Sequence, residues 1–558
     1  MIGPPLGPGP SGGPITKDNT GVEYYCTIFA ACESLHDDKT IWCGSDDGLI
    51  HITRDSGESW ADVTPPDMPE WMQINSIEPH PTEAGGLYVA GTRYKLDDFK
   101  PYLYQTLDFG KSWKRIDKGI DAKHFTRVVR ADAQRPGLLY AGTENGLYVS
   151  FDDGKQWQTF QCNLPTVPVT DLALKNNDLI VATQGRSFWM LDDVSILQQW
   201  KPELAKKPLH IFPTRPVHRM RAGRGRSGRT SGANIAGGVP IKFFLENKIG
   251  EKQIGRVEIL NSDDEVVRVF STKPDRDENE LKLTMDQGMN TLTWDMRHAG
   301  AETFSGLILW GGGTTGPMAL PGDYTAKFTI ADKSKKANSE KNSDDDESDD
   351  ESETDNADEE SAGNGDDASE EELANDGSDE NEMVSAQLKF SIVKDQRSSA
   401  SQEDLQAQFD FLIDVRDKLT QTHKTIKRLR DVKQQIESIT KRLGDKEEKD
   451  DFKEIIKMGK QVVKQLSEGE KTLYQTKNRT NQDPLNFPIQ LNNRLSALVS
   501  VVSRGDNRPT DQAYAVRDEL KVLIDEAIAK LDEAMESGVS DFNEAFRKAE
   551  IPAVFVDE

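Results

Sequence analysis

Residues 53–60 read TRDSGESW, and the same pattern returns as TLDFGKSW at residues 106–113 and as SFDDGKQW at residues 150–157. The shared pattern is [ST]xDxGxxW, and its copies begin 53 and 44 residues apart. One match would mean little. Three matches at this spacing indicate an internal repeat, because self-similarity at a period of roughly 20–50 residues is the signature of repeat architectures.

The sequence around each copy repeats as well. A pair of apolar runs joined by a short turn leads into each copy, and a fourth pair, at residues 178–193, lacks the Gly and Trp of the pattern. Another alternating run opens the later units: INSIEPH at residues 74–80, FTRVVRA at 125–131 and VTDLALK at 169–175. Four strands in roughly 45–50 residues make one blade of a β-propeller. The sequence therefore predicts about four propeller blades over residues 22–199.

The chemistry of the repeated pattern is structural. An Asp in a turn accepts hydrogen bonds from nearby backbone N–H groups, and Gly takes a positive φ that other residues avoid. A Trp at the end of the pattern is expected to pack between successive blades. Three similar acids in three equivalent turns cannot converge on one substrate. The residues assigned this structural role are Asp55, Gly57, Trp60, Asp108, Gly110, Trp113, Asp152, Gly154 and Trp157.

These repeats resemble the Asp-box (BNR) repeats of sialidases, xyloglucanase-like glycosidases and the sortilin propeller. The resemblance is closest to a large bacterial family described as "glycosyl hydrolase" or "sortilin-like", and it also covers EYYCTIFA (residues 23–30), RYKLDDF (93–99) and ATQGRSFWMLDD (182–193). It implies an extracytoplasmic protein, either periplasmic, cell-surface or secreted. The first 14 residues, MIGPPLGPGPSGGP, have neither the charged nor the apolar region of a signal peptide.

Members of that family begin far upstream, with a signal peptide and further blades. The resemblance therefore implies that this chain is the C-terminal part of a longer protein. Four blades leave open sheet edges, which act as pairing templates, so we expect an open arc that recruits the missing upstream blades or associates with itself. A closed four-bladed ring and a ring of two copies are the alternatives. Residues 1–21 favour neither alternative, because they have the composition of an interior Pro/Gly linker.

Residues 200–238 are predicted to form an Arg/Gly-rich linker. Its arginines lack interleaved aromatic residues on which bases stack, so a nucleic-acid partner is not expected. Alternating runs then predict a β-sandwich over residues 239–332 and 385–396. Trp294-Asp-Met-Arg297 and Pro321-Gly-Asp-Tyr324 resemble the Ig-like module of flagellar hook-capping proteins, which implies an Ig-like fold with a core Trp.

An acidic block at residues 333–384 interrupts this predicted sandwich. Residues 340–382 hold 22 Asp and Glu against one Lys, a net charge of −21 out of −27 for the whole chain. So few apolar residues cannot form a core, and the block is predicted to be disordered. DxDxDG spacing is absent, so no calcium site is expected. No other metal and no cofactor is predicted.

Residues 402–547 change to a helical period of apolar residues. Such a stripe fits either a coiled coil that mediates oligomerisation or helices that fold back on each other. An antiparallel helical bundle is favoured, because short turns join the helices. No run approaches the ~20 apolar residues that span a bilayer.

The loops between the second and third strands of each blade share one face with the connections between blades, opposite the Asp-box turns. The ligand-binding candidates on this face are Trp71, Arg93, Tyr94, Arg127 and Arg186, with His124 nearby. Weaker candidates for catalytic carboxylates are Asp46, Asp47, Asp97, Asp98 and Glu144.

Two functions fit this organisation. The favoured one is an extracytoplasmic binding or scaffold protein whose propeller face holds a protein or glycan, since the added modules place surfaces and do no chemistry. The alternative is a glycoside hydrolase of the Asp-box propeller type, which needs two carboxylates ~5–10 Å apart in an open cleft. Asp-Asp-Gly and Glu-Asn are also ordinary hairpin-turn residues, so the sequence favours a protein without catalytic activity.

Overall fold

The computed structural model describes residues 13–15, 25–220, 232, 237–275, 279–332, 384–444 and 450–551. The chain divides into two compact units, Met1–Lys201 and Pro202–Glu558. The predicted linker at residues 1–21 and the predicted acidic block at 333–384 lie almost wholly outside the described residues, as do Arg221, Arg224, Arg226 and Arg229.

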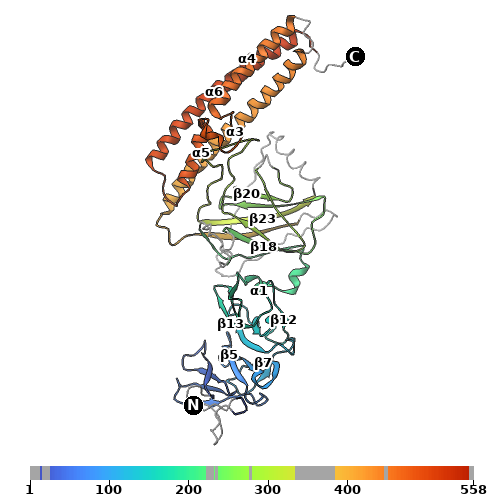
Figure 1. Ribbon diagram of the computed structural model, residues 1–558, viewed down its shortest axis with the longest axis vertical. Helices are drawn as coiled ribbons and strands as arrows, with labels where there is room; N and C mark the ends of the chain where they lie inside the picture. Colours follow the sequence, from blue (N-terminus) through green and yellow to red (C-terminus); the bar gives the residue numbers. More distant parts are fainter. Residues whose placement is uncertain are drawn as a thin grey trace, which may run out of the picture. The chain divides into compact units, whose positions relative to one another are not determined.

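The first unit consists of four antiparallel sheets that follow one another along the chain (Figure 1). The first sheet contains β1 (Ile28–Glu33), β2 (Ile41–Ser45), β3 (Ile50–Thr53) and β4 (Ala61–Asp62). The second contains β5 (Gln73–Pro79), β6 (Leu87–Arg93), β7 (Asp98–Thr106) and β8 (Lys114–Arg115). The third contains β9 (Thr126–Ala131), β10 (Leu139–Thr143), β11 (Gly146–Ser150) and β12 (Gln158–Thr159). The fourth has three strands, β13 (Val169–Lys175), β14 (Asp178–Thr183) and β15 (Phe188–Leu191), and the short helix α1 (Ser195–Gln199) follows it.

The predicted four short strands per repeat are confirmed in the first three sheets. Side chains alternate between the two faces of a strand, and both faces of the second and third sheets are apolar because each is covered by a neighbouring sheet. Trp42 and Val89 lie in the core between the first and second sheets, and Val129 lies between the second and third. Tyr140 and Val181 lie between the third and fourth.

Repeated backbone hydrogen bonds distinguish the two ends of the sheets. In the first three sheets, the turn of the [ST]xDxGxxW pattern, named the Asp-box turn for its sequence resemblance, bonds to the turn between the first two strands: Ser56 N to Lys39 O, Phe109 N to Gly85 O and Asp153 N to Gly137 O. The loop between the second and third strands bonds to the residue before the first strand: Asp46 N to Thr27 O, Glu144 N to Phe125 O and Gln184 N to Pro168 O. The Asp-box turns therefore lie at one end of the sheets, and the loops that carry the candidate residues lie at the other, which we call the loop end.

The second unit begins with two sheets that share one core. One sheet has the order β16 (Leu209–Phe212), β18 (Val239–Leu245) and β22 (Gly288–Trp294). The other has the order β17 (Val217–Arg219), β24 (Val384–Lys394), β23 (Gly322–Asp332), β19 (Gln253–Leu260), β20 (Val266–Ser271) and β21 (Leu281–Lys282). The buried Trp294 and Tyr324 rings lie 5.3 Å apart in the core.

Part of the predicted linker at residues 200–238 is folded. It contains a 3-10 turn (Pro202–Lys206) and the strands β16 and β17. Leu209 and Ile211 are buried in the two-sheet core, so this stretch joins the sheets because it has apolar side chains to bury. Arg219 is buried as well, and it pairs with Asp506 at 2.7 Å.

Among the described residues, four α-helices complete the second unit: α3 (Gln402–Gly444), α4 (Asp450–Leu473), α5 (Leu491–Val502) and α6 (Asp511–Lys548). Their apolar stripes meet in one core, and Figure 1 shows the three long helices running alongside one another. α6 begins where Thr510 Oγ1 accepts a hydrogen bond from Ala513 N, the usual geometry of an N-cap. No helix in the described ranges is both long and apolar enough to cross a membrane.

A long loop between β22 and β23 docks onto these helices. Trp310 and Asn493 exchange two hydrogen bonds, at 2.7 and 2.9 Å. The Tyr474 hydroxyl accepts from Ile308 N and donates to Gly306 O. The loop places Phe304 in the helical core, so the sheets and the helices of this unit are packed together.

Candidate functional site

The three Asp-box turns have the same geometry. In the first, Thr53 Oγ1 donates to Asp55 Oδ1 at 2.7 Å, Gly57 N donates to Thr53 Oγ1, and Ser59 N donates to Asp55 Oδ1 at 2.9 Å. Asp108 and Asp152 accept the equivalent hydrogen bonds. The side-chain hydrogen bond from Ser59, followed by the backbone one, lowers the pKa of Asp55 to about 2. These carboxylates are therefore directed into their own turns.

In the second and third sheets, the Trp of the repeated pattern connects the sheet to the preceding one. Trp113 of the second sheet donates its indole N–H to Val63 O, beyond the last strand of the first sheet, at 2.7 Å. Trp157 of the third sheet donates to Ile116 O, beyond the last strand of the second sheet, at 2.5 Å. An indole N–H that is buried needs such an acceptor.

At the loop end of the first two sheets, Tyr25, Trp71 and Lys95 form a first aromatic group. The rings of Tyr25 and Trp71 are 6.2 Å apart, and Lys95 Nζ lies 5.3 Å from the centre of the Tyr25 ring. Trp71 has a φ of 60°, a strained conformation for a bulky side chain and one that concentrates at functional sites. The backbone of Gly13 lies against its indole, since a Cβ at Gly13 would be 2.3 Å from the ring.

A second aromatic group lies beside the first, because Tyr94 precedes Lys95 in the chain. The Tyr94 and Phe125 rings stack at 5.3 Å, and the ring of Phe99 lies 6.1 Å from that of Phe125. The Arg127 guanidinium is 5.2 Å from the centre of the Phe125 ring, within cation–π distance. Arg127 also pairs with Glu144 at 2.6 Å. We call the two groups together the rim.

Three of the candidate catalytic carboxylates at this end, Asp46, Asp98 and Glu144, have partners within the fold. Asp46 accepts from Thr27 N at 2.9 Å, and Glu144 is held by Arg127. Asp98 pairs with Arg93 at 3.3 Å and accepts from the Tyr102 hydroxyl at 2.6 Å. Burial opposes ionisation of Asp98, but the Tyr102 hydrogen bond and the neighbouring donors outweigh it and lower its pKa.

Asp47 is buried beside Cys26. Burial, and next the charge of Asp47, raise the pKa of the Cys26 thiol to about 11. Burial, and next the charge of Asp46, raise the pKa of Tyr25 to about 12. The two adjacent carboxylates therefore lie beneath the first aromatic group.

Three further candidates are not members of the two aromatic groups. Asp97 is exposed at the end of the 3-10 turn Tyr94–Leu96, with a φ of 59°. Arg186 is exposed and donates to Gly185 O in its own loop. His124 lies 2.8 Å from the Tyr148 hydroxyl through Nδ1.

A second cluster, made of charged side chains, lies on the first strands of the second, third and fourth sheets. It was not predicted from the sequence. Arg130 of β9 pairs with Asp171 of β13 at 2.8 Å and approaches Glu78 of β5 to 3.7 Å. It also donates to Ser76 Oγ at 2.7 Å and to Leu172 O at 2.9 Å. Burial raises the pKa of Glu78 to about 7, against the lowering effect of Arg130. We call Glu78, Arg130 and Asp171 the inner cluster.

A signal for the inner cluster was present in the sequence. Glu78, Arg130 and Asp171 interrupt the apolar runs that open the second, third and fourth repeats, and a charged residue within such a strand needs a partner when it is buried. No such signal marks Tyr25 and Phe125 of the rim in the sequence. Each contacts an aromatic residue that belongs to another sheet, and a local sequence pattern does not show such contacts. In the described part of the chain, no group of three or more His, Cys, Asp or Glu is arranged to hold a metal ion.

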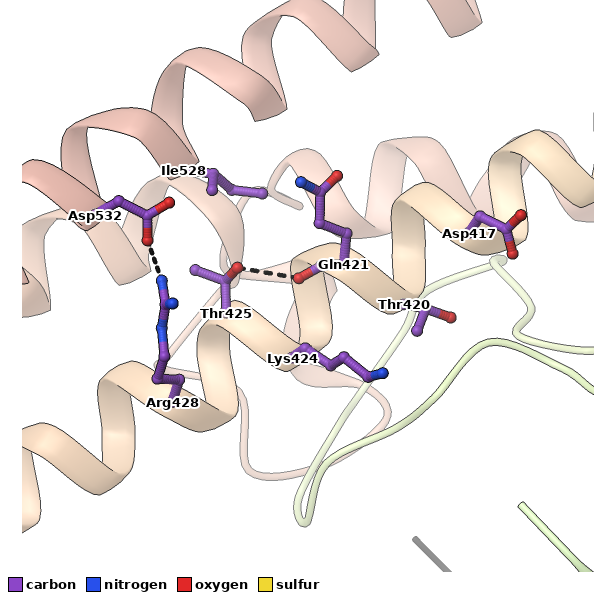
Figure 2. Close-up of a pocket in the computed structure, with 8 residues that line it drawn as sticks. All are labelled: Asp417, Thr420, Gln421, Lys424, Thr425, Arg428, Ile528 and Asp532. Carbon is purple, nitrogen blue, oxygen red and sulfur yellow. Dashed lines mark hydrogen bonds and ion pairs between the residues drawn. The ribbon is translucent and has the colours of Figure 1, made fainter. Parts of the chain in front are cut away.

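A cavity of about 430 Å³ lies between α3 and α6 (Figure 2). Arg428 and Asp532 form an ion pair across it, and Thr425 Oγ1 donates to Gln421 O at 3.0 Å. Lys424 extends from the same helix to Glu302 at 2.8 Å. The lining contains no thiol or histidine, and its remaining charged group, Asp417, pairs with Arg416 of the same helix, so this cavity is part of the polar face of the helices.

Neither a protein-family model nor a curated protein matches this sequence. Among solved structures, a YCF48 bound to D1 peptide is similar at 20% identity and a TM-score of 0.24, over 32% of this chain and 52% of that one. YCF48 from Cyanidioschyzon merolae is similar at 17% identity and a TM-score of 0.24, over 30% and 54%. A GH74 xyloglucanase from Xanthomonas campestris is similar at 17% identity and a TM-score of 0.25, over 31% and 28%. The match thus spans about half the length of the YCF48 structures, and the fold assignment rests on the strands of this chain.

Proposed function

We propose that the first unit is a binding module that holds an extended protein or glycan segment along the rim. The observation that carries the proposal is the pair of neighbouring groups of rings and cations that make up the rim. Trp71, Tyr25 and Lys95 form one group, and Tyr94 and Phe125 form the other, with Arg127 over both of its rings. Aromatic and arginine side chains dominate the binding energy of protein interfaces.

The surroundings of the rim favour binding over catalysis. Asp98 and Glu144 are each paired with an arginine, so both carboxylates are engaged within the fold. Lys95 lies over the Tyr25 ring and Arg127 over the Tyr94 and Phe125 rings, so aromatic rings hold both cations at the rim. The Asp-box family, the Ig-like character of the second unit's sheets and an extracytoplasmic location are part of this proposal, and they rest on the sequence resemblance alone.

Ligand screening on the full chain tests the proposal. Glycan arrays and a peptide library identify ligands, and titration then compares variants. Tyr94→Ala and Arg127→Ala are expected to weaken binding by roughly tenfold or more. Arg186→Ala is the matched control, since it removes a cation from the loop end without touching the rim, and it is expected to change binding less than about twofold. Equal losses in all three variants, or no ligand in either screen, would contradict the proposal.

The inner cluster supports a second candidate function, hydrolysis of glycosides. A glycosidase needs one carboxyl group held protonated near neutral pH and a second that is ionised. Glu78, with its pKa near 7, has the properties of the acid. Asp171 is the second carboxyl group, across Arg130, and its side chain is exposed. Release of aryl alcohol from chromogenic glycosides tests this candidate, and it fails if Glu78→Gln retains the activity of the wild type.

The raised pKa of Glu78 also has a consequence for stability that is independent of activity. Between the ordinary pKa of 4.5 and about 7, folded Glu78 keeps a proton that the unfolded chain has lost. Stability therefore falls as pH rises through this window, by at most about 3 kcal/mol. Urea unfolding of the full chain at pH 5 and pH 7.5 is expected to show this decline for the wild type. In Glu78→Gln the decline is expected to be smaller by that amount, and an unchanged decline would refute the assignment.

A further inference from the structure

The fourth sheet has one covered face and one open face. Leu172, Val181 and Trp189 pack toward the third sheet. Because side chains alternate along a strand, Phe188 and Met190 point the other way, and they are 76% and 56% exposed. Ile180 of β14 pairs in register with Met190, and Ala182 pairs with Phe188. The open face therefore carries an apolar patch, and patches of this kind mark interaction sites on soluble proteins.

In each of the first three sheets, the corresponding face packs against the next sheet along the chain. We call this face the leading face. The opposite face, which packs against the preceding sheet, is called the trailing face. Tyr140 and Val149 belong to the leading face of the third sheet, and both are buried against the fourth. The fourth sheet is thus the one described sheet whose leading face is uncovered.

The first sheet shows the complementary feature on its trailing face. A Cβ on Gly110 would lie 2.5 Å from Val63, and a Cβ on Gly154 would lie 2.8 Å from Ile116, because the preceding sheet covers both turns. At the equivalent Gly57, the nearest atom is 4.0 Å away and belongs to Trp60 of the same turn. The position is the same in all three turns, and only in the first is it open.

A large side chain of the first sheet is exposed for the same reason. Trp157 is 2% exposed because it lies between the second and third sheets, whereas Trp60, at the same place in the repeated pattern, is 39% exposed. Phe29 of β1 is also exposed, at 54%, where the pairing of β1 with β2 is irregular.

From these faces we propose that the fourth sheet of one copy of this chain packs against the first sheet of a second copy, head to tail. The interface between consecutive sheets is formed three times within the chain. The leading face of the fourth sheet and the trailing face of the first are the two halves of a further interface of that kind. A heterologous contact of this type forms a closed dimer if it is satisfied at both ends, and an open filament if it is not.

A second copy of this chain carries both faces that such an interface requires. The trailing face of the first sheet carries the Gly57 turn and Trp60, and these are the groups that the second and third sheets use against their predecessors. An unrelated partner would need to reproduce both. The inference goes beyond ligand binding at the rim, since it concerns the faces of the sheets and not their loop end.

Sedimentation equilibrium of the full chain tests this proposal, with protein concentrations up to about 100 µM. We expect the wild type to associate. Phe188→Glu, on the leading face, and Trp60→Glu, on the trailing face, are each expected to weaken association by at least about tenfold, because each buries an unpaired charge. Val522→Glu is the matched control, since Val522 is 57% exposed on α6, and it is expected to associate like the wild type. Circular dichroism and thermal melting verify that all variants are folded.

Three outcomes would overturn the proposal. One is a wild-type chain that stays monomeric over the whole concentration range. A second is association that Phe188→Glu leaves unchanged. The third is association that Phe188→Glu abolishes and Trp60→Glu does not affect, which would indicate like faces pairing instead of a head-to-tail contact.

Discussion

Asp108 illustrates how the sequence encodes a turn at the scale of single residues. Its carboxylate accepts hydrogen bonds from Thr106 and Ser112, both in the same turn. The side-chain hydrogen bond from Ser112, followed by the backbone one, lowers the pKa of Asp108 to about 2. A carboxylate engaged in this way stabilises the turn and has little capacity left for a ligand.

Replacing this carboxylate is therefore expected to affect stability and not binding. Asp108→Ala should lower the free energy of unfolding by about 0.5–2 kcal/mol, the range found when a side chain that caps backbone N–H groups is removed. Lys111→Ala, an exposed substitution in the same turn, is the control. Urea unfolding measures the first effect, and titration with a rim ligand measures the second. Loss of binding at an unchanged melting temperature would show that the acid has a role outside its turn.

At the scale of elements, the docking of the loop between β22 and β23 explains why this loop contains a run of glycines. The sequence alone does not show their role. A Cβ at Gly312 would lie 1.9 Å from Ser496 Oγ and 3.2 Å from the backbone of the same residue on α5. At Gly313 the nearest atom is at 3.7 Å, an ordinary contact. Gly313 N donates to Ser496 O at 3.2 Å. The loop therefore docks through close approach of its backbone to a helix.

These two neighbouring glycines form a matched pair for testing the docking. Gly312→Ala is expected to destabilise the second unit by about 1–3 kcal/mol, the usual cost of overpacking. Gly313→Ala is expected to change its stability by less than about 0.5 kcal/mol. Chemical denaturation of the full chain, followed by the fluorescence of its tryptophans, measures both. Equal effects of the two substitutions would mean that the contact with Ser496 does not hold the loop.

At the scale of the whole molecule, the sequence was informative where the chain repeats. The Asp-box turns and the strand pairs appear three times, so each copy supports the interpretation of the others. The docking of the β22–β23 loop onto the helices could not be predicted in this way, because the loop is not part of a repeat. The rim was only partly predictable: Trp71, Tyr94 and Arg127 were placed on the correct end of the sheets, but Tyr25 and Phe125 meet them across different sheets. Such contacts depend on packing, which a local pattern does not contain.

The acidic block is the largest feature predicted from composition, and the sheet around it shows how it is accommodated. β23 and β24 pair as neighbours, with Ile330 opposite Val384. The ends of the block therefore start from adjacent positions in one sheet, and a short turn can replace it without moving either strand.

Deleting residues 335–383 and joining the ends with a Gly/Ser turn of about four residues is expected to leave the two-sheet core folded. Loop-closure entropy grows with the logarithm of loop length, so the shorter connection should stabilise this core by about 2 kcal/mol. In a second variant, a neutral Gly/Ser segment of equal length replaces the block. This variant keeps the loop-closure entropy of the long connection and loses its negative charge, so it separates the effect of length from that of charge. Calorimetry of the three chains measures the transition of the second unit. Loss of cooperative unfolding in the deletion variant, but not in the neutral replacement, would contradict this expectation. It would mean that β23 and β24 cannot pair through a short turn, so that the sheet requires the length of the block.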